Sequence, residues 1–331
     1  MSHGDMVYMS EGGCQMGDAG RDLAVVQFPH PGGEHNPDRS EEMSWNAEAH
    51  RRKFIRSPGR YLDRGNIPRS GTVSFWGEWE PQSRVVERYG KAGPEMPRFL
   101  HEPFLQRPAD LMVRRQNTDP FVFGDAFLYS NCRQFTRTLG PSHMQRLGEG
   151  SVVLFGSKLN HRFVLDTLMV IGSDTPYVIG EPDGFGNDVT EVFHAATFEP
   201  LAASPKLAGT HAVLYRGLMY GLGRQEMFSF VPANADGRPF ARPSIELTDL
   251  VNSKNSRAAK ITPATPGQAR DVWHNIVGQV RAQGLDLAVF LAEPPIQPGQ
   301  AVIAGGEGEG CAANEGRPAA TSRVARRRGC R

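Results

Sequence analysis

The stretch SVVLFGSKLNHRFVLDTLMVI, residues 151–171, decides the fold class that we predict for this chain. Its two halves, 151–157 and 162–171, are runs of apolar and β-branched residues with the composition typical of strands. The short linker at 158–161 suits a β-hairpin, in which the two strands pair antiparallel. We therefore expect a sheet at the centre of the chain.

Further strands are predicted on both sides of this hairpin, at residues 22–28, 72–80, 119–129, 210–215 and 227–231. The aromatic one at 119–129 alternates its side chains around Gly124, which is typical of a strand with a bulge. The chain has 37 glycines and 25 prolines among 331 residues, and this content favours turns and short strands over a helical bundle.

The best-specified helix begins after Thr265, which can cap its N-terminus together with Gln268 in a capping box. Apolar residues then recur at a spacing of four, and Gly284 ends the helix. An apolar strand at 285–291 follows, so this helix–strand unit should pack against the main sheet. A shorter helix is predicted at 44–56.

These elements predict an α+β fold, built on a curved antiparallel sheet or a small β-barrel with a few packed helices. The fold should form a single domain over residues 22–296. Residues 1–21 are polar and Gly-rich, and we expect them to be a mobile arm. Residues 297–331 are rich in Gly, Ala, Glu and Arg, so they bury too little surface to offset their chain entropy and should form a disordered basic tail.

Composition excludes several classes of protein. No apolar run approaches the ~18 residues needed to cross a bilayer, and no signal peptide is visible. The four cysteines form no C-x-x-C pair, which argues against a cysteine zinc site and against a disulfide framework. We therefore expect a soluble, cytoplasmic protein with no membrane contact, no cofactor and no bound metal.

Charge is segregated along the chain, although the net charge is only +1. Residues 1–50 hold nine acidic residues and two arginines, whereas residues 51–69 hold seven basic residues and one aspartate. Arginine binds phosphate through two N–H groups at once and stacks on bases, so this basic segment favours contact with nucleic acid or a nucleotide. The predicted phosphate-binding residues are Arg51, Arg52, Lys53 and Arg56.

Three tryptophans in or near the basic segment are candidates for base stacking. The strand at 72–80 carries two of them, separated by a glutamate that can accept a hydrogen bond from an exocyclic amine of a base. The prediction requires that this strand open onto solvent beside the arginines. In the alternative, the tryptophans fill the core and the basic side chains are solvated. The predicted base-binding residues are Trp45, Trp76, Glu78 and Trp79.

A loop with two histidines supports a competing prediction, an enzyme. His30, Glu34 and His35 are its candidate catalytic residues, and the Pro-Gly-Gly between them excludes a helix. The chemistry would be hydrolytic or nucleotide-modifying, either through a metal with His50 or His101 as a further ligand or through acid–base catalysis. The alternative is a turn with two incidental histidines.

The polar set at 129–132 follows the aromatic strand and is a candidate pocket rim. Cys132, within this set, is either a nucleophile or a small packing residue. A third class of function also stays open, a structural or phage-associated protein without a ligand.

The runs LGEGSVVLFGS, residues 147–157, and FVLDTLMVI, residues 163–171, resemble a segment of the PUA-like barrels of the EVE and ASCH group. In that group a strand with the pattern G-D/E-x-V-x-F-x-S precedes a strand with the pattern V-x-D-x-x-x-V. The resemblance covers about 25 residues and implies a PUA-like barrel core that binds RNA, or a modified base flipped into an aromatic pocket. No base-binding residue of the group maps onto a numbered position of this chain.

Overall fold

The structure of the protein is a computed structural model. It describes residues 21–30, 32–38, 51–90, 93, 95–106, 117–181, 189–221, 226–247 and 259–297. The chain divides into two units, residues 1–298 and 299–331, and every described residue belongs to the first. Apart from Arg21 and Gln297, the predicted arm and tail lie outside the described residues, as do Trp45 and His50.

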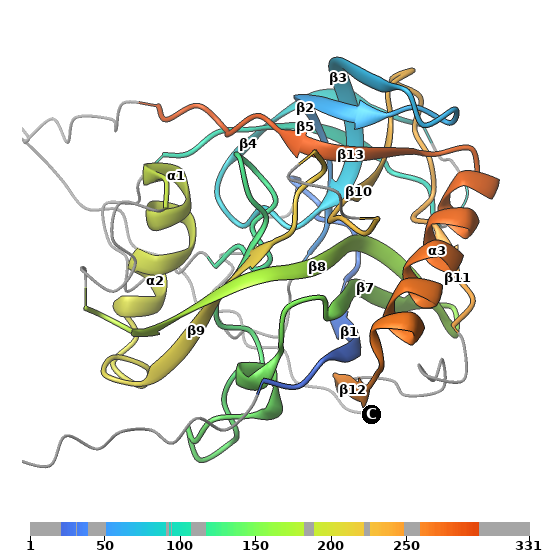
Figure 1. Ribbon diagram of the computed structural model, residues 1–331. Helices are drawn as coiled ribbons and strands as arrows, with labels where there is room; N and C mark the ends of the chain where they lie inside the picture. Colours follow the sequence, from blue (N-terminus) through green and yellow to red (C-terminus); the bar gives the residue numbers. More distant parts are fainter. Residues whose placement is uncertain are drawn as a thin grey trace, which may run out of the picture. The chain divides into compact units, whose positions relative to one another are not determined.

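The first unit has an α+β fold whose described strands all belong to two sheets (Figure 1), so the predicted fold class is confirmed. The seven-stranded sheet has the order β12-β1-β7-β8-β9-β6, and β11 pairs with β8. Its strands are β1 (Ala24–His30), β6 (Leu128–Tyr129), β7 (Val152–Leu159), β8 (Arg162–Val178), β9 (His211–Gly217), β11 (Ser244–Ile245) and β12 (Lys260–Pro263).

The six-stranded sheet has the order β13-β10-β3-β2-β5-β4, and β13 also pairs with β2. Because of this additional pairing, β2, β3, β10 and β13 close into a ring of four strands. The strands of this sheet are β2 (Lys53–Leu62), β3 (Pro68–Gly77), β4 (Ser83–Arg88), β5 (Phe99–Pro103), β10 (Val231–Asn234) and β13 (Asp286–Leu291).

Both sheets are mixed, which corrects the expectation of an antiparallel sheet. β1 pairs parallel with β7, and β2 pairs parallel with β5. The partners in each parallel pair are separated by other elements, as a parallel pairing requires, because the chain must cross back before it can run in the same direction. Sequence patterns do not reveal which distant strands will pair.

The hairpin predicted at 151–171 is present as β7 and β8. Asn160 and His161 form its turn with positive φ angles of 46° and 65°. β8 extends beyond the predicted strand and pairs with β7 along its first half and with β9 along its second half. Figure 1 shows β8 as the long strand that crosses the centre of the unit.

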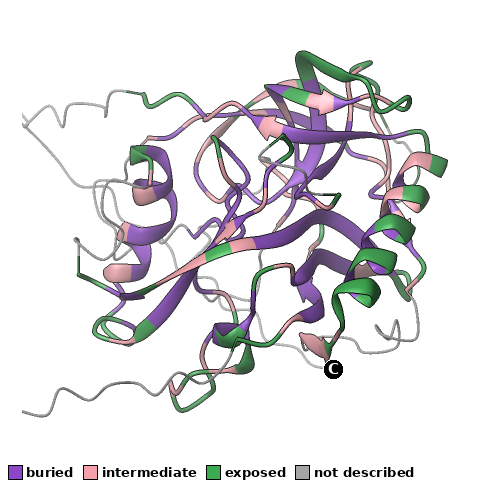
Figure 2. Ribbon diagram, viewed as in Figure 1, coloured by how far each residue is buried: buried purple, intermediate pink, exposed green. Residues whose placement is uncertain are grey.

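The helix predicted after Thr265 is also present, as α3 (Pro266–Ala282). The Thr265 side chain and Gln268 form the expected capping box, and Gly284 follows with a φ of 76°. One side of α3 is buried and the other is exposed (Figure 2). The buried side contributes to a hydrophobic cluster with side chains from both sheets, including Val25 of β1 and Leu287 of β13. The described part of the chain contains no helix that is both long and apolar enough to span a bilayer.

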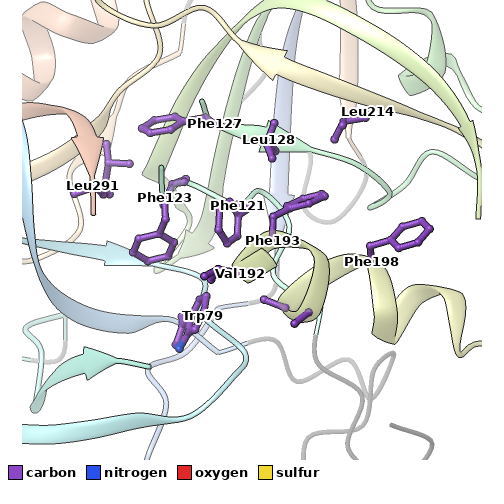
Figure 3. Packing of buried hydrophobic residues seen from close by; sticks show 14 of the residues in the cluster. Trp79, Phe121, Phe123, Phe127, Leu128, Val192, Phe193, Phe198, Leu214 and Leu291 are labelled. Carbon is purple, nitrogen blue, oxygen red and sulfur yellow. The ribbon is translucent and has the colours of Figure 1, made fainter. Parts of the chain in front are cut away.

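Two other predicted elements are wrong. The helix expected at 44–56 is contradicted from Lys53 onward, because Lys53–Leu62 is β2 and pairs with β3 over ten residue pairs. The aromatic segment 119–129 is mostly irregular, with only Leu128 and Tyr129 in a strand. Its rings nevertheless form the core: Phe121, Phe123 and Phe127 are buried together with Trp79 (Figure 3).

The helical segment 191–202 was not expected from the sequence. It consists of α1 (Glu191–Phe193), a π-helical turn (His194–Phe198) and α2 (Glu199–Ala202). Thr190 caps the segment by accepting a hydrogen bond from the Phe193 backbone. The Phe193 and Phe198 side chains of this segment belong to the same hydrophobic cluster as the aromatic residues (Figure 3).

Candidate functional site

The two described tryptophans of the predicted base-binding cleft are buried in the core. Trp76 is 3% exposed and Trp79 is 1% exposed. Their indole N–H groups donate to the backbone oxygens of Phe240 and Gln82, each at 2.8 Å. The guanidinium of Arg242 lies 5.4 Å from the centre of the Trp76 ring. No base can stack on these rings as they stand, so the predicted tryptophan cleft is wrong.

Two of the predicted phosphate-binding residues are buried as well. Arg52 is 1% exposed and forms ion pairs with Glu78 at 2.9 Å and with Asp166 at 2.8 Å. Burial opposes the charge of Arg52, but the two carboxylates outweigh it and raise the pKa of the guanidinium. The Lys53 ammonium donates to the Pro81 oxygen at 2.7 Å. These contacts correct the predictions that Arg52 and Lys53 hold phosphates and that Glu78 contacts a base edge.

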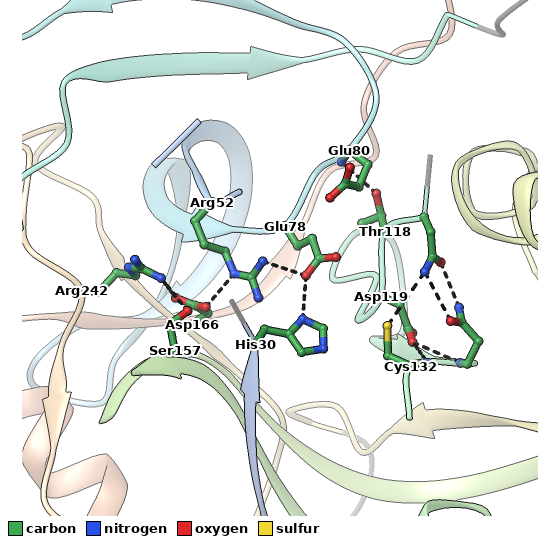
Figure 4. Close-up of polar contacts among 12 residues, drawn as sticks. His30, Arg52, Glu78, Glu80, Thr118, Asp119, Cys132, Ser157, Asp166 and Arg242 are labelled. Atoms are coloured by element: carbon green, nitrogen blue, oxygen red, sulfur yellow. Dashed lines mark hydrogen bonds and ion pairs between the residues drawn. The ribbon is translucent and has the colours of Figure 1, made fainter. Parts of the chain in front are cut away.

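The side chains around Arg52 form a buried ion-pair network (Figure 4). His30 Nδ1 lies 3.1 Å from the same Glu78 oxygen that Arg52 contacts. Arg242 pairs with Asp166 at 3.5 Å and donates to the Ser157 hydroxyl at 2.8 Å. We call this set the ion-pair network; its members are His30, Arg52, Glu78, Ser157, Asp166 and Arg242.

Local strand geometry positions the members of the network. Arg52 directly precedes β2 and Glu78 directly follows β3, and the pairing of Lys53 with Gly77 brings these two residues side by side. Asp166 occupies a β-bulge in β8, since Phe155 pairs with Thr167 while Gly156 pairs with Leu165. A bulge changes the direction of a side chain, and here it places a carboxylate among two guanidiniums.

The three residues of the predicted histidine loop do not converge on one site. His30 contacts Glu78, whereas the Glu34 carboxylate pairs with Arg98 at 2.6 Å. The His35 ring lies 5.8 Å from the ring of His101, measured between centres. These contacts give each of the three residues a different partner, so a single site made of His30, Glu34 and His35 stays a prediction.

A second group of titratable side chains consists of the half-buried His35 and the buried His101 and Lys53. Burial, followed by the positive charge of Lys53, lowers the pKa of His35 to about 4 and that of His101 to about 3. Burial also lowers the pKa of Lys53 to about 8, against the opposing charge of Glu80. Within the described ranges, no three His, Cys, Asp or Glu side chains are grouped to hold a metal ion.

Cys132 is placed as a packing residue. Burial and the negative charges of Asp119 and Glu78 raise the pKa of its thiol well above the usual value, so the reactive thiolate is disfavoured. The polar set 129–132 lies around the Asp119 carboxylate, which accepts hydrogen bonds from the backbone N–H groups of Ser130, Asn131 and Cys132. Figure 4 shows Asp119 beside Cys132. This set therefore shapes a buried loop.

An open pocket of about 1040 Å³ lies on the six-stranded sheet, and we call it the sheet-face pocket. Arg56, the fourth predicted phosphate-binding residue, lines this pocket together with Arg84. Both guanidiniums pair with the carboxylate of Glu102, Arg56 at 2.5 Å. Arg56 is 39% exposed and Arg84 is 72% exposed at their side chains. Hydrogen bonds from these arginines lower the pKa of Glu102.

A carboxylate on another part of the same pocket has one oxygen without a hydrogen bond. Glu293 lines the sheet-face pocket directly after β13, and its Oε1 is buried without a hydrogen-bond partner among the described residues. The carboxylate packs against Gly124, where an added Cβ would lie 2.8 Å from Oε1. Buried acceptors are nearly always paired, and this oxygen, turned toward Gly124 and shielded from solvent, is an exception.

Sequence reasoning missed most of the sheet-face pocket. Arg84 lies in the edge strand β4, and Glu293 lies in a Pro-rich segment after β13, so neither belongs to a recognisable motif. Arg51, the remaining predicted phosphate-binding residue, is half-buried. Among the residues that line the sheet-face pocket, only Arg56 was predicted from the sequence, because it lies in the basic segment.

Comparison with known proteins finds no matching family model, no significantly similar curated protein and no significantly similar solved structure. The resemblance to PUA-like barrels therefore stays a prediction. Its residues, 147–171, belong to the β7–β8 hairpin and the turn before it, in the seven-stranded sheet.

Proposed function

We propose that the protein binds a nucleotide unit, either free or within a nucleic acid, in the sheet-face pocket. One observation carries the proposal: two partly exposed arginines, oriented by one shared carboxylate, line a pocket large enough for such a ligand. The ligand is of the class expected from the basic segment, but its site is the sheet-face pocket, which neither Trp76 nor Trp79 lines.

Arg56 and Arg84 would hold the phosphate. A guanidinium has five N–H donors, and Glu102 occupies only part of this capacity on each arginine. The remaining donors suit phosphate oxygens, which bind arginine through charge-assisted hydrogen bonds. Glu102 would act by keeping both side chains in place.

The rest of the pocket matches the sugar and the base. Thr72 and Ser74 supply hydroxyl groups on β3. Phe104 supplies an apolar wall, and the half-buried Glu293 carboxylate would accept a hydrogen bond from an exocyclic amine of a base. Glu293 thus takes the role that the sequence analysis gave to Glu78.

Calorimetric titration of the full chain with the four nucleoside monophosphates tests the proposal. We expect Arg56→Ala and Arg84→Ala each to weaken binding roughly 10-fold or more, because a hydrogen bond to a charged group contributes ~1.5–3 kcal/mol. Binding of the unphosphorylated nucleosides should change much less in these variants.

Arg270→Ala is the matched control, since Arg270 is an exposed arginine of α3 that lines neither described pocket. The proposal fails if no monophosphate binds, or if Arg270→Ala weakens binding as much as Arg56→Ala does.

An enzyme is the second candidate function, and the contact between His30 and Glu78 favours it. A carboxylate at Nδ1 fixes the tautomer and orientation of an imidazole, which is how a general base is prepared. Incubation with nucleoside monophosphates, followed by chromatography of the products, tests this candidate. His30→Gln and Glu78→Gln should abolish turnover, and an unreactive wild-type protein would refute the candidate for these substrates.

We also propose that the protein resides in a reducing compartment such as the cytoplasm. Cys132, the cysteine that the described ranges contain, is a free thiol there, and free thiols are typical of reducing compartments. Localisation of the full chain by microscopy of a tagged form would test this.

A further inference from the structure

The β2–β3 hairpin presents one continuous face to two pockets. Its register is regular over all ten residue pairs, so side chains alternate strictly between the two faces. Arg56, Pro58 and Arg60 consequently point to the same face of β2. Their partners on β3 share that face and are Ser74, Thr72 and Ser70.

The first half of this face belongs to the sheet-face pocket. Its second half belongs to another pocket of about 540 Å³, which Arg60, Ser70, Met219 and Tyr220 help to line. We call this second hollow the hairpin-end pocket. Pro58 and Arg60, on either side of the boundary, are two residues apart, or ~7 Å along the strand.

The hairpin-end pocket has an aromatic wall. Tyr220 is 41% exposed, and its ring packs edge-on against Phe228 with 5.1 Å between the ring centres. Tyr61 of β2 also lines this pocket, but it points to the opposite face of the strand from Arg60 and is half-buried. A half-exposed ring that is held from one side offers a stacking surface to a base.

Arg60 is positioned to hold a phosphate at this second pocket. Its guanidinium lies 4.7 Å from the centre of the Phe290 ring, which orients it. Across the described part of the chain, no carboxylate forms an ion pair with Arg60, in contrast to Arg56 and Arg69. An exposed cation without a counter-charge is a favourable partner for a phosphate.

We infer that a single strand of nucleic acid lies along this face, with one nucleotide in the sheet-face pocket and a later one in the hairpin-end pocket. The inference rests on the proposed function and specifies its ligand as a strand longer than one nucleotide. A duplex does not fit, because its bases are stacked and paired and cannot enter two separate hollows.

Fluorescence anisotropy with labelled single strands of ~12 nucleotides tests the inference. RNA and DNA of the same mixed sequence and the matching DNA duplex are compared, and the nucleoside monophosphates are titrated in parallel. We expect tight binding of at least one single strand and weak binding of the duplex. Preference for RNA would indicate contacts with the 2′-hydroxyl.

Variants of the second pocket separate the two proposals. Tyr220→Ala should weaken binding of the single strand roughly 5- to 150-fold, as expected for the loss of one stacked base, and should leave monophosphate binding unchanged. Arg60→Ala should reduce the salt dependence of strand binding by about one phosphate contact. Arg270→Ala is again the control, and unchanged thermal unfolding verifies that each variant is folded.

If the single strand binds no more tightly than a monophosphate, or if Tyr220→Ala and Arg60→Ala leave strand binding unchanged, the inference is overturned while the proposed function stands. If neither strand nor monophosphate binds, both fail.

Discussion

At the scale of single residues, the ion-pair network is a costly arrangement to maintain. Arg52 and Arg242 bring two positive charges into the interior, and Glu78 and Asp166 balance them. Buried charges lose their hydration, and only close contact with opposite charges offsets this loss. Arg52 and Arg242 are therefore held in ion pairs with these carboxylates, and they are not available to bind a phosphate from the solvent.

Asp166→Asn tests this balance. The substitution leaves Arg52 and Arg242 with one carboxylate between them, so we expect the free energy of unfolding to fall by ~3–5 kcal/mol. Urea denaturation monitored by tryptophan fluorescence measures it. Glu226→Gln, which removes an exposed partner of Arg270, should change stability by only ~0.5 kcal/mol. Equal effects of the two substitutions would show that the network contributes no more than a surface pair.

At the scale of secondary-structure elements, two glycines show that the same residue type has different effects in a strand and in a helix. Gly156 lies in β7 beside the bulge of β8, where an added Cβ would be 2.1 Å from the backbone oxygen of Val164. Gly278 lies on the exposed side of α3, where an added Cβ meets nothing within 4 Å. The first glycine is required by close backbone approach, whereas the second weakens its helix.

Alanine at each position gives opposite predictions. Gly156→Ala should destabilise the protein by ~1–3 kcal/mol or more, because backbone atoms cannot move aside as a flexible side chain can. Gly278→Ala should stabilise it by up to ~1 kcal/mol, the difference in helix propensity between the two residues. Thermal and urea unfolding of both variants measure these changes. Destabilisation by Gly278→Ala, or tolerance of Gly156→Ala, would contradict the packing described for these strands.

At the scale of the whole molecule, the half-buried His35 and the buried His101 couple stability to pH. The folded-state pKa values of His35 and His101, about 4 and about 3, lie below the ordinary value of 6.5. As pH falls below 6.5, the unfolded chain therefore binds protons that the folded chain does not, and folding is disfavoured. Asp119 acts in the opposite direction, because burial raises its pKa to about 6.

The two histidines together outweigh Asp119, so we expect the urea midpoint to be constant near pH 7 and to decrease steadily between pH 6.5 and about 3. Lys53→Met should raise the pKa of both histidines, because it removes the positive charge that lowers them. Titration of the imidazole proton signals by NMR measures these values. A pKa near 6.5 for His35 or for His101 in the folded wild-type protein would refute the values given for these two residues.

The sequence by itself determined the elements whose signals are local. The β7–β8 hairpin follows from two apolar runs and a short linker, and α3 follows from the capping box of Thr265 and Gln268 and from Gly284 beyond its end. Such signals depend on neighbours within a few residues, so they can be interpreted without knowing the fold.

The tertiary structure alone decided which side chains are available to a ligand. Tryptophan occurs in binding clefts and in cores, and arginine can be buried where carboxylates pair with it. Which of the two applies depends on residues distant in the chain. Trp76 is covered by Phe240 and Arg242, and Arg52 is neutralised by Asp166, more than a hundred residues away in the sequence. Arg56 remains at a pocket because its partner Glu102 is itself partly exposed. Burial is a sum over long-range contacts, and no local pattern encodes that sum.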